Sequence, residues 1–308
     1  MRILIQTPSG FDATPWVAGL RREFPDAEVC SWQPGDDSPA DYALVWKSPP
    51  EFYEKSRGLR TVFALGAGVD ALLPVTPPAI PLIRLDDAGM AGQMAAYVAR
   101  AIFEALPAPV SGADWNSVRA ARMRESETGL AVGVAGLGAL GSHVATVLSG
   151  LGFEVHGWSR MPKILPGVTG HSGPAGLDAM LRVSRVLVNL LPLTPETENL
   201  FDAGLFEKLP AGSHFINLAR GAHVDDTALL AALDSGRLGR ATLDVFRIEP
   251  LPATHPFWHH PKITVTPHIS ARTLTGPALK QIAAKIRNLE AGVAPESLPG
   301  FVDRLRGY

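Results

Sequence analysis

The chain has 308 residues and a formal net charge of -2 at pH 7, with 46% hydrophobic and 19% charged residues. A chain of this length exceeds the size at which one hydrophobic core stays efficient, so we expect two domains. The composition excludes a disordered or fibrous protein. The small net charge, without any basic cluster, also argues against a nucleic acid or an anionic membrane as a partner.

The chain contains a single cysteine, Cys30, and therefore no internal disulfide, which fits a reducing compartment. The N-terminal segment has the pattern of a first strand rather than of a signal peptide, and no apolar run is long enough to span a membrane. We therefore expect a cytoplasmic protein.

Short apolar runs alternate with longer amphipathic segments along the chain, which is typical of doubly wound parallel sheets. One series of predicted strands covers residues 2–6, 27–32, 42–46, 61–65 and 81–85. A second series covers residues 131–135, 154–158, 186–190, 214–218, 241–245 and 262–266. The sequence predicts an α/β protein with two such sheets.

Two helices organise these series into domains. A helix predicted at residues 89–106 links the series, and a helix at 275–290 returns from the last strand to the first domain. The first domain is thus expected to be discontinuous, comprising residues 1–92 and 273–308, and the second to span residues 93–272. The charged segment 107–128 has no clear period, and we expect an arm there that serves a homodimer through the second domain.

A glycine-rich turn follows the strand at 131–135, where Gly136, Gly138 and Gly141 have the GxGxxG spacing. The first glycine permits a tight turn, the second lets a pyrophosphate approach the backbone, and the third lets helix and strand pack closely. The N-terminus of the following helix favours an anion. The motif alone also fits a turn that binds nothing, or a methyltransferase, so it predicts only a nucleotide-type ligand.

The strand at 154–158 ends without the acidic residue that usually contacts the ribose 2′-hydroxyl of NAD. Ser159 and Arg160 follow it instead. Because a guanidinium and a hydroxyl suit a 2′-phosphate, the sequence favours NADP(H) over NAD(H), which stays possible. The alternative is that Arg160 is an ordinary solvated side chain.

Three polar residues, Arg220, Glu249 and His268, lie at or shortly after the ends of strands in the second series. Reduction of a 2-keto acid needs a cation for the carboxylate, a proton donor for the carbonyl oxygen, and a group that keeps the donor protonated. Arg220, His268 and Glu249 fit these roles in that order. Each residue alone also fits a salt bridge, a loop charge or a structural histidine, but together with the glycine turn they predict a catalytic site.

His255, His259 and His260 crowd one loop with a spacing that zinc sites also show. No cysteine or carboxylate completes the set, and hydride transfer needs no metal. We therefore expect no metal.

With these motifs the chain resembles the D-isomer-specific 2-hydroxyacid dehydrogenase family, and within it the branch that reduces glyoxylate and hydroxypyruvate. The resemblance spans nearly the whole chain and includes FALGAGVD at 63–70, GLGALG at 136–141, GWSR at 157–160, INLARGAHV at 216–224 and TPHIS at 266–270. It implies a flavodoxin-like substrate domain and a Rossmann dinucleotide-binding domain, with a cleft between them.

The resemblance also implies roles for single residues. Arg220, Glu249 and His268 match the family's substrate-binding arginine, the glutamate paired with its histidine, and the acid/base histidine. Cofactor contacts are implied for Gly136, Leu137, Gly138, Ala139, Leu140, Gly141, Ser159, Arg160, Leu191, Pro192, Thr197, Leu218, Ala219, Asp244 and Ser270. Substrate contacts are implied for Trp46, Lys47, Gly66, Ala67, Gly68 and Val69, besides Arg220 and His268.

The function expected from the sequence is NADPH-dependent reduction of a small 2-keto acid, such as glyoxylate or hydroxypyruvate, with histidine as the proton donor. Two alternatives stay open. One is an NAD-linked D-2-hydroxyacid dehydrogenase for another substrate, and the other is a non-catalytic NADP-binding sensor or scaffold.

Overall fold

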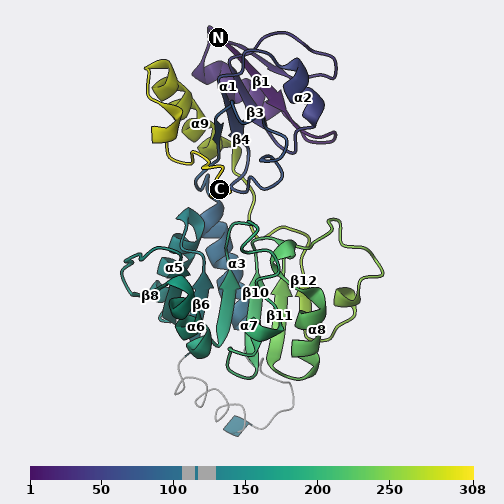
Figure 1. The fold of residues 1–308 in the computed structure, drawn as a ribbon, viewed down its shortest axis with the longest axis vertical. Coiled ribbons are helices and arrows are strands. Elements are labelled where there is room, and N and C mark those ends of the chain that lie inside the picture. The colour runs from purple at the N-terminus through teal and green to yellow at the C-terminus, as the bar shows by residue number, and fades with distance from the viewer. Residues whose placement is uncertain (106–114, 117–129) are drawn as a thin grey trace. The chain divides into compact units, whose positions relative to one another are not determined.

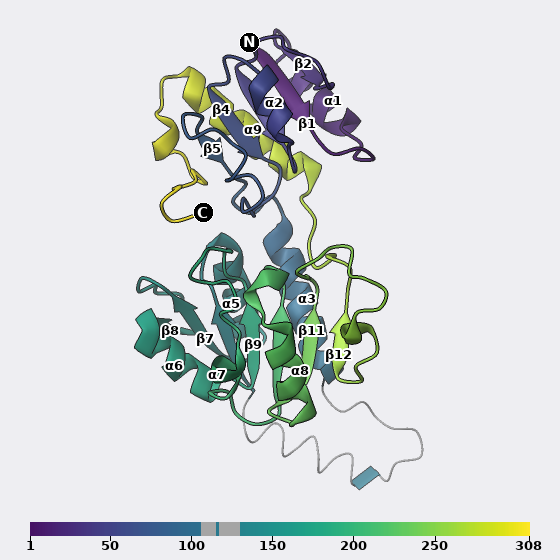
Figure 2. The ribbon, with the colours of Figure 1, turned by 45° about the vertical axis from the view of Figure 1, so that its right-hand side comes forward.

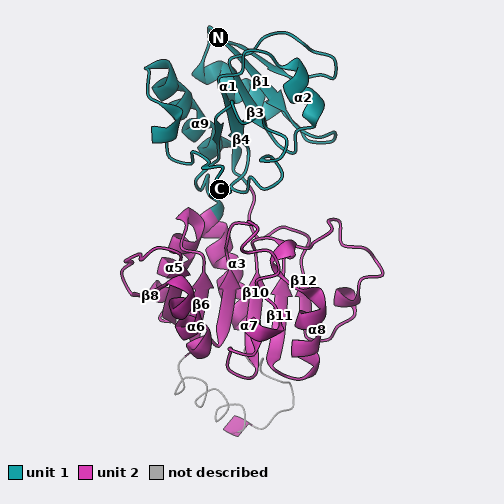
Figure 3. Cartoon of the chain, in the orientation of Figure 1, with its two compact units in different colours: residues 1–90, 273–308 teal, residues 91–272 magenta. Residues whose placement is uncertain are grey.

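The computed structural model describes residues 1–105, 115–116 and 130–308, so nearly all of the predicted arm at 107–128 lies outside the described residues. The chain forms two compact units (Figure 3). The first unit comprises Met1–Met90 and Thr273–Tyr308, and the second comprises Ala91–Arg272.

The first unit contains a parallel sheet with the strand order β2-β1-β3-β4-β5, of which Figure 1 labels β1, β3 and β4. Its strands are β1 (Arg2–Gln6), β2 (Glu28–Ser31), β3 (Tyr42–Val45), β4 (Thr61–Ala64) and β5 (Leu82–Ile83). Its helices are α1 (Thr14–Glu23), α2 (Pro50–Lys55) and α9 (Thr275–Glu290). Helices α1 and α9 pack so closely that a Cβ atom at Gly19 would lie 2.1 Å from the Leu279 side chain.

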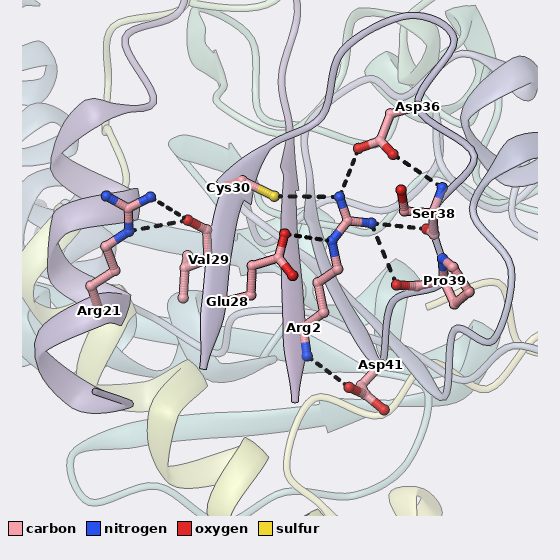
Figure 4. Close-up of polar contacts among 9 residues, drawn as sticks. All are labelled: Arg2, Arg21, Glu28, Val29, Cys30, Asp36, Ser38, Pro39 and Asp41. Carbon is pink, nitrogen blue, oxygen red and sulfur yellow. Dashed lines mark hydrogen bonds and ion pairs between the residues drawn. The ribbon is translucent and has the colours of Figure 1, made fainter. Parts of the chain in front are cut away.

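Arg2, the first residue of β1, joins the edge strand β2 to the loop that precedes β3 (Figure 4). Its guanidinium pairs with Glu28 at 3.1 Å and with Asp36 at 2.9 Å, and its backbone N–H donates to Asp41 at 2.7 Å. Since the Arg2 side chain is only 15% exposed, these partners replace water that it loses on folding. The cluster serves the fold and lies at the amino ends of the strands.

The second unit contains a parallel sheet of seven strands in the order β12-β11-β10-β9-β6-β7-β8. The strands are β6 (Ala131–Ala135), β7 (Glu154–Ser159), β8 (Val168–Ser172), β9 (Val186–Asn189), β10 (Ser213–Asn217), β11 (Leu238–Leu243) and β12 (Ile263–Val265). The chain first builds outward from β6 to β8, and then from β9 to β12 on the other side. The order therefore reverses between β6 and β9, where doubly wound sheets bind their ligands.

Helices cover both faces of this sheet (Figure 2). Because strand residues alternate between faces, Val186 and Val188 pack with α3 (Met90–Ala105) and α5 (Ala139–Gly150), whereas Leu187 points to the opposite core. That opposite core also contains residues of α6 (Gly173–Val183), α7 (Ala203–Phe206) and α8 (Asp226–Asp234). Short 3-10 turns, η1 (Gly221–His223), η2 (Pro256–Trp258) and η3 (Pro295–Ser297), complete the described elements.

These two parallel sheets confirm the predicted α/β class. Every predicted strand is present: β1 and β6 have the predicted bounds, and the other strands differ at one or both ends. Helix α9 has the predicted bounds, with Leu279, Ile282, Ile286 and Leu289 buried. Strand β8 was not predicted, because its residues are exposed or half-buried at the sheet edge and form no apolar run. Among the described helices, none is long and apolar enough to cross a membrane.

Candidate active site

The glycine turn joins β6 to α5 at the point where the strand order reverses. Gly136 has a φ of 104°, and a Cβ atom at Gly141 would lie 1.8 Å from the Gly136 carbonyl oxygen. These two glycines are therefore required by the local backbone itself. Gly138 and Ala139 are exposed, and a Cβ atom at Gly138 would meet nothing within 4 Å, so the second glycine faces open space.

Strand β7 brings the predicted 2′-phosphate residues next to this turn, because the Gly136 N–H donates to the Trp158 carbonyl at 2.9 Å. Ser159 is the last residue of β7, and Arg160 is exposed. A hydrogen bond from the Thr194 side chain and one from the Glu196 backbone N–H lower the pKa of the Glu196 carboxyl group, and the Arg160 charge adds a smaller effect in the same direction. Arg160 thus lies near the segment that follows β9.

Lys163 adds a second positive charge at the glycine turn that the sequence did not single out. Its Nζ atom donates to the Leu137 carbonyl at 2.7 Å and to Ser142 Oγ at 2.9 Å. Both acceptors are neutral oxygens, so these bonds do not neutralise the ammonium charge, which lies beside an exposed, anion-favouring helix N-terminus. A lysine four residues after the end of a strand carries no spacing signal, which is why sequence reasoning missed it.

The segment after β9 contains the predicted cofactor residues Leu191, Pro192 and Thr197. The Thr197 hydroxyl donates to the Pro192 carbonyl at 2.8 Å and accepts the Thr194 N–H at 2.8 Å. Leu191 is buried in the core, as are Leu137 and Leu218. The side chains of these three leucines are engaged in packing, so any cofactor contact from them involves the backbone.

Arg220 is placed by a turn that fits against the segment after β11. Its carbonyl accepts the Asn217 Nδ2 amide at 2.9 Å, and a Cβ atom at the next residue, Gly221, would lie 1.9 Å from the backbone carbon of Phe246. Arg247 closes the arrangement by donating to the Val224 carbonyl at 2.8 Å and to the Ala222 carbonyl at 3.3 Å. The Arg220 turn therefore contacts the segment that carries Glu249.

The loop bearing His268 is held by the fully buried carboxylate of Asp244 at the end of β11. This carboxylate accepts the Thr266 hydroxyl at 2.5 Å, the Ile269 N–H at 2.9 Å and the Ser270 N–H at 2.8 Å. The Asp244 carbonyl also accepts the His268 N–H at 2.8 Å. The loop needs such support because His268 has a φ of 54°, a region that residues other than glycine seldom adopt.

Glu249 and His268 form a direct pair. Glu249 Oε2 lies 2.8 Å from His268 Nδ1, while Glu249 Oε1 accepts the Phe246 N–H at 3.0 Å. The imidazole is 45% exposed and the carboxylate 31% exposed, so the pair is accessible to a small molecule. The bond from the Phe246 N–H to Oε1 orients the carboxylate, and the contact between Oε2 and Nδ1 orients the imidazole. Nε2 is therefore the ring nitrogen that does not face Glu249.

A closed chain of contacts joins the predicted trio within the second unit. The Arg220 turn touches Phe246, Phe246 binds Glu249, and Glu249 binds His268. A second series of hydrogen bonds links His268 back to Arg220. The His268 N–H donates to the Asp244 carbonyl, the Asp244 N–H donates to the Asn217 carbonyl, and the Asn217 side-chain amide donates to the Arg220 carbonyl. Such an arrangement offers a cation, a proton donor and a fixed carboxylate, which is the equipment for reducing a carbonyl beside a carboxylate.

Sequence reasoning missed three buried residues behind this site, namely Asn189, Asn217 and His223. Each is at most 1% exposed, and they bond to one another. The signal was present in the asparagines, since a polar residue at the end of an otherwise apolar buried strand requires hydrogen-bond partners. Their connection was not visible, because the partners are separated by 28 and 34 residues.

The predicted substrate residues of the first unit lie at the carboxyl ends of β3 and β4. Trp46 and Lys47 follow β3, and a Cβ atom at Gly66 would lie 2.4 Å from the Trp46 ring, so the two segments touch. Gly68 is exposed and Ala67 half-buried, whereas the Val69 side chain belongs to the core. Val69 is thus available to a ligand only through its backbone.

Two histidines of the histidine-rich loop contact different carboxylates. His255 Nε2 lies 3.6 Å from Asp226, and His260 Nε2 lies 3.3 Å from Asp234. Within residues 1–105, 115–116 and 130–308, no group of three or more potential ligands is placed to hold a metal ion. Asp225 caps α8 by accepting the Thr227 and Ala228 N–H groups.

A Rossmann-type unit with a glycine turn and a histidine–carboxylate pair at the same sheet edge defines a dehydrogenase. The family model for the D-isomer specific 2-hydroxyacid dehydrogenase, NAD binding domain, matches residues 93–270. A glyoxylate/hydroxypyruvate reductase A from Serratia proteamaculans is 46% identical over 321 aligned residues, covering 100% of both chains. The chain belongs to the D-isomer specific 2-hydroxyacid dehydrogenase family.

Solved structures agree with this assignment. A family member from Xanthobacter autotrophicus, in complex with NADPH and MES, has a TM-score of 0.88 and 37% identity, covering 99% of each chain. An NADPH-dependent glyoxylate/hydroxypyruvate reductase from Sinorhizobium meliloti, in complex with NADP and sulfate, has a TM-score of 0.85 and 34% identity, covering 100% of this chain and 99% of that one. The family predicted from the motifs is therefore confirmed.

Proposed function

We propose that this protein reduces small 2-keto acids, with glyoxylate and hydroxypyruvate as the favoured substrates, at the expense of NADPH. The observation that carries the proposal is the 2.8 Å pair between Glu249 and an accessible His268, placed at the same sheet edge as the glycine turn. The names of the Serratia and Sinorhizobium relatives support the substrate class.

The residues present fit a dinucleotide. Gly138 is exposed with open space where a side chain would stand, and α5 begins at the next residue. A pyrophosphate can therefore approach the backbone and the positive end of the helix. Leu191, Pro192, Thr197, Leu218, Ala219 and Ser270 are assigned to the rest of the cofactor-binding surface, whereas the buried Asp244 carboxylate supports it from behind by holding the His268 loop. A reduced nicotinamide bound there supplies a hydride to the keto carbon.

The chain's own residues manage the proton and the substrate charge. Arg220 binds the substrate carboxylate and polarises the keto group, and His268 Nε2–H gives its proton to the carbonyl oxygen as the hydride arrives at the carbon. Glu249 accepts the Nδ1–H, which fixes the orientation of the ring. The product is the 2-hydroxy acid, and His268 is left neutral until it takes up a proton from solvent.

The preference for NADPH is assigned to Ser159, Arg160 and Lys163. Two positive charges and a hydroxyl lie beside the glycine turn, and NADPH or NADP occupies the Xanthobacter and Sinorhizobium structures. In the first unit, Trp46, Lys47 and the turn from Gly66 to Val69 are assigned to the substrate carboxylate. We further propose a cytoplasmic homodimer that forms through the dinucleotide-binding domain.

A substrate panel with both coenzymes tests the proposal. Absorbance at 340 nm is followed with NADPH or NADH against glyoxylate, hydroxypyruvate, pyruvate and a keto acid with a bulky side chain. We expect the highest kcat/KM with NADPH and either glyoxylate or hydroxypyruvate. NADPH binding without oxidation by any keto acid would instead identify a sensor, and preference for NADH would overturn the coenzyme assignment.

A further inference from the structure

His223 is a fully buried imidazole that the proposed chemistry does not use. It ends the turn η1, which begins directly after Arg220. Its Nδ1 atom lies 2.9 Å from Asn189 Nδ2, and its Nε2 atom lies 3.2 Å from the Pro192 carbonyl. The ring therefore joins the turn that bears Arg220 to the segment after β9.

Backbone groups fix the orientation of both neighbouring amides. The Leu191 N–H donates to Asn189 Oδ1 at 3.1 Å, and the Ala219 N–H donates to Asn217 Oδ1 at 3.1 Å. Each oxygen must therefore stand where the structure places it, since the opposite orientation would set two donors against each other. Asn189 Nδ2 consequently donates to Asn217 Oδ1 at 3.0 Å and to His223 Nδ1.

The tautomer of His223 follows from this orientation. Because Asn189 Nδ2 can only donate, His223 Nδ1 must accept and therefore carries no proton. The proton of the neutral ring is on Nε2, which donates it to the Pro192 carbonyl. A protonated ring would place an N–H against the amide N–H of Asn189, so the buried network fits only the neutral imidazole.

We propose that His223, as the neutral Nε2–H tautomer, is a positioning residue that couples the cofactor segment at Pro192 to the substrate-binding arginine. On one side it holds the Pro192 carbonyl. On the other, the path runs through Asn189 and Asn217 to the carbonyl of Arg220, the last bond being 2.9 Å. The inference rests on the proposed function, because it acts through residues assigned to cofactor and substrate.

Substitution by methionine and by glutamine separates positioning from packing. His223→Met has a similar volume but removes the Nε2–H donor from the Pro192 carbonyl, which keeps the bond from the Thr197 hydroxyl, whereas His223→Gln retains one acceptor and one donor. We expect His223→Met to raise both the Kd of NADPH and the KM of glyoxylate about tenfold, corresponding to one lost buried hydrogen bond at each site. His223→Gln is expected to restore both constants to within about threefold of the wild type.

His214→Met is the matched control. His214 is also a buried histidine of the second unit, bonded to Thr242 at 2.9 Å, but it lies near the amino end of β10, whereas His223 lies in the turn that follows the carboxyl end of this strand. Its loss should lower the Tm without changing Kd or KM, which do not depend on the amount of active protein. If His223→Met likewise changes only the Tm, His223 has a packing role and the inference is wrong.

The tautomer provides a test that needs no variant and no turnover. In wild-type protein carrying ¹⁵N-histidine, we expect His223 Nδ1 to show the chemical shift of an unprotonated nitrogen and Nε2 that of a protonated one. A protonated Nδ1 would overturn the inference even if His223→Met fails to fold. Absence of NADPH oxidation with every keto acid would refute the proposed function alone, since the tautomer is read independently.

Discussion

In the second sheet, the loops after β6 and β7 are shaped by the backbone, whereas the loops after β9 to β12 are held by buried side chains. At β6 and β7, glycines shape the backbone, and the turn closes on itself with Gly141 against Gly136. At β9 to β12, buried side chains hold the loops, with Asn189, Asn217 and Asp244 bonding to groups many residues away. The first side is therefore a local structure, whereas the second depends on residues from several strands converging.

The difference teaches where sensitivity should lie. A site formed by the backbone loses its function when a side chain is added to it. A site held by side chains loses its function when one of their hydrogen-bonding atoms is removed. A cofactor that is bound by backbone N–H groups tolerates varied side chains around it. A reaction that needs an imidazole at a defined place depends on the groups that hold the loop.

Among the residues that support the site without taking part in the reaction, the largest effect is expected from Asp244→Asn, which puts an amide N–H where backbone N–H groups point at a carboxylate. The His268 loop would lose at least one of its three bonds, and kcat should fall about a hundredfold through misplacement of the imidazole. The Kd of NADPH, measured by fluorescence, should change less. The control Asp234→Asn removes an exposed carboxylate and should keep wild-type kcat. A loss confined to NADPH affinity would mean that Asp244 serves the cofactor instead of the loop.

Two glycine substitutions come next and separate folding from binding. Gly138→Ala meets no atom within 4 Å, so the free energy of unfolding should stay unchanged while NADPH affinity falls about tenfold or more. Gly141→Ala forces a shift of the Gly136 carbonyl and should lower the free energy of unfolding by about 1 to 3 kcal/mol. Calorimetry and NADPH titration check both. If the affinity for NADPH is unchanged in Gly138→Ala, the pyrophosphate does not bind at this turn.

Arg160→Asp tests the coenzyme preference. Replacing the guanidinium by a carboxylate should reduce kcat/KM for NADPH about tenfold more than for NADH, because one charge-assisted bond is replaced by repulsion. Arg182→Asp makes the same charge change on α6 and should leave the ratio as it is. Equal losses with both coenzymes would show that Arg160 does not contact the 2′-phosphate.

The smallest effect concerns stability alone. Burial lowers the pKa of His214 to about 4, from an ordinary value near 6.5. Between these two values the unfolded chain binds a proton that the folded one does not, so the free energy of unfolding decreases as the pH falls from 6.5 to 4, by up to about 3 kcal/mol. His214→Met should reduce this slope in urea titrations, with a remainder from His171, whose pKa burial also lowers. An unchanged slope would contradict the assignment to His214.

The same contrast explains how much the sequence could predict. Periodicity located every strand with an apolar run and the bounds of α9, and spacing located the glycine turn, because both signals are local. Arg220, Glu249 and His268 were predicted as one site because the chemistry of keto-acid reduction requires their side-chain types, and their catalytic roles stay a prediction. The exposed strand β8 has no apolar pattern and gave no such signal.

What the sequence could not reveal is the support of the site. Lys163 reaches the glycine turn through a long side chain, and Asn189, Asn217 and His223 meet only after three segments have folded together. Asp244 was expected at the cofactor, yet its buried carboxylate is occupied by the loop of His268. Such assignments need three-dimensional contacts, because a hydrogen bond between distant segments leaves no periodic trace.

The most direct test of the catalytic assignment is the turnover of His268→Ala beside that of His260→Ala. Both variants remove an imidazole that is paired with a carboxylate in the second unit, but only His268 adjoins the proposed cofactor and substrate residues. We predict that kcat with NADPH and glyoxylate falls about a thousandfold in His268→Ala, with the Kd of NADPH unchanged, and stays at the wild-type value in His260→Ala. Wild-type turnover in His268→Ala would contradict the role of His268 as the proton donor.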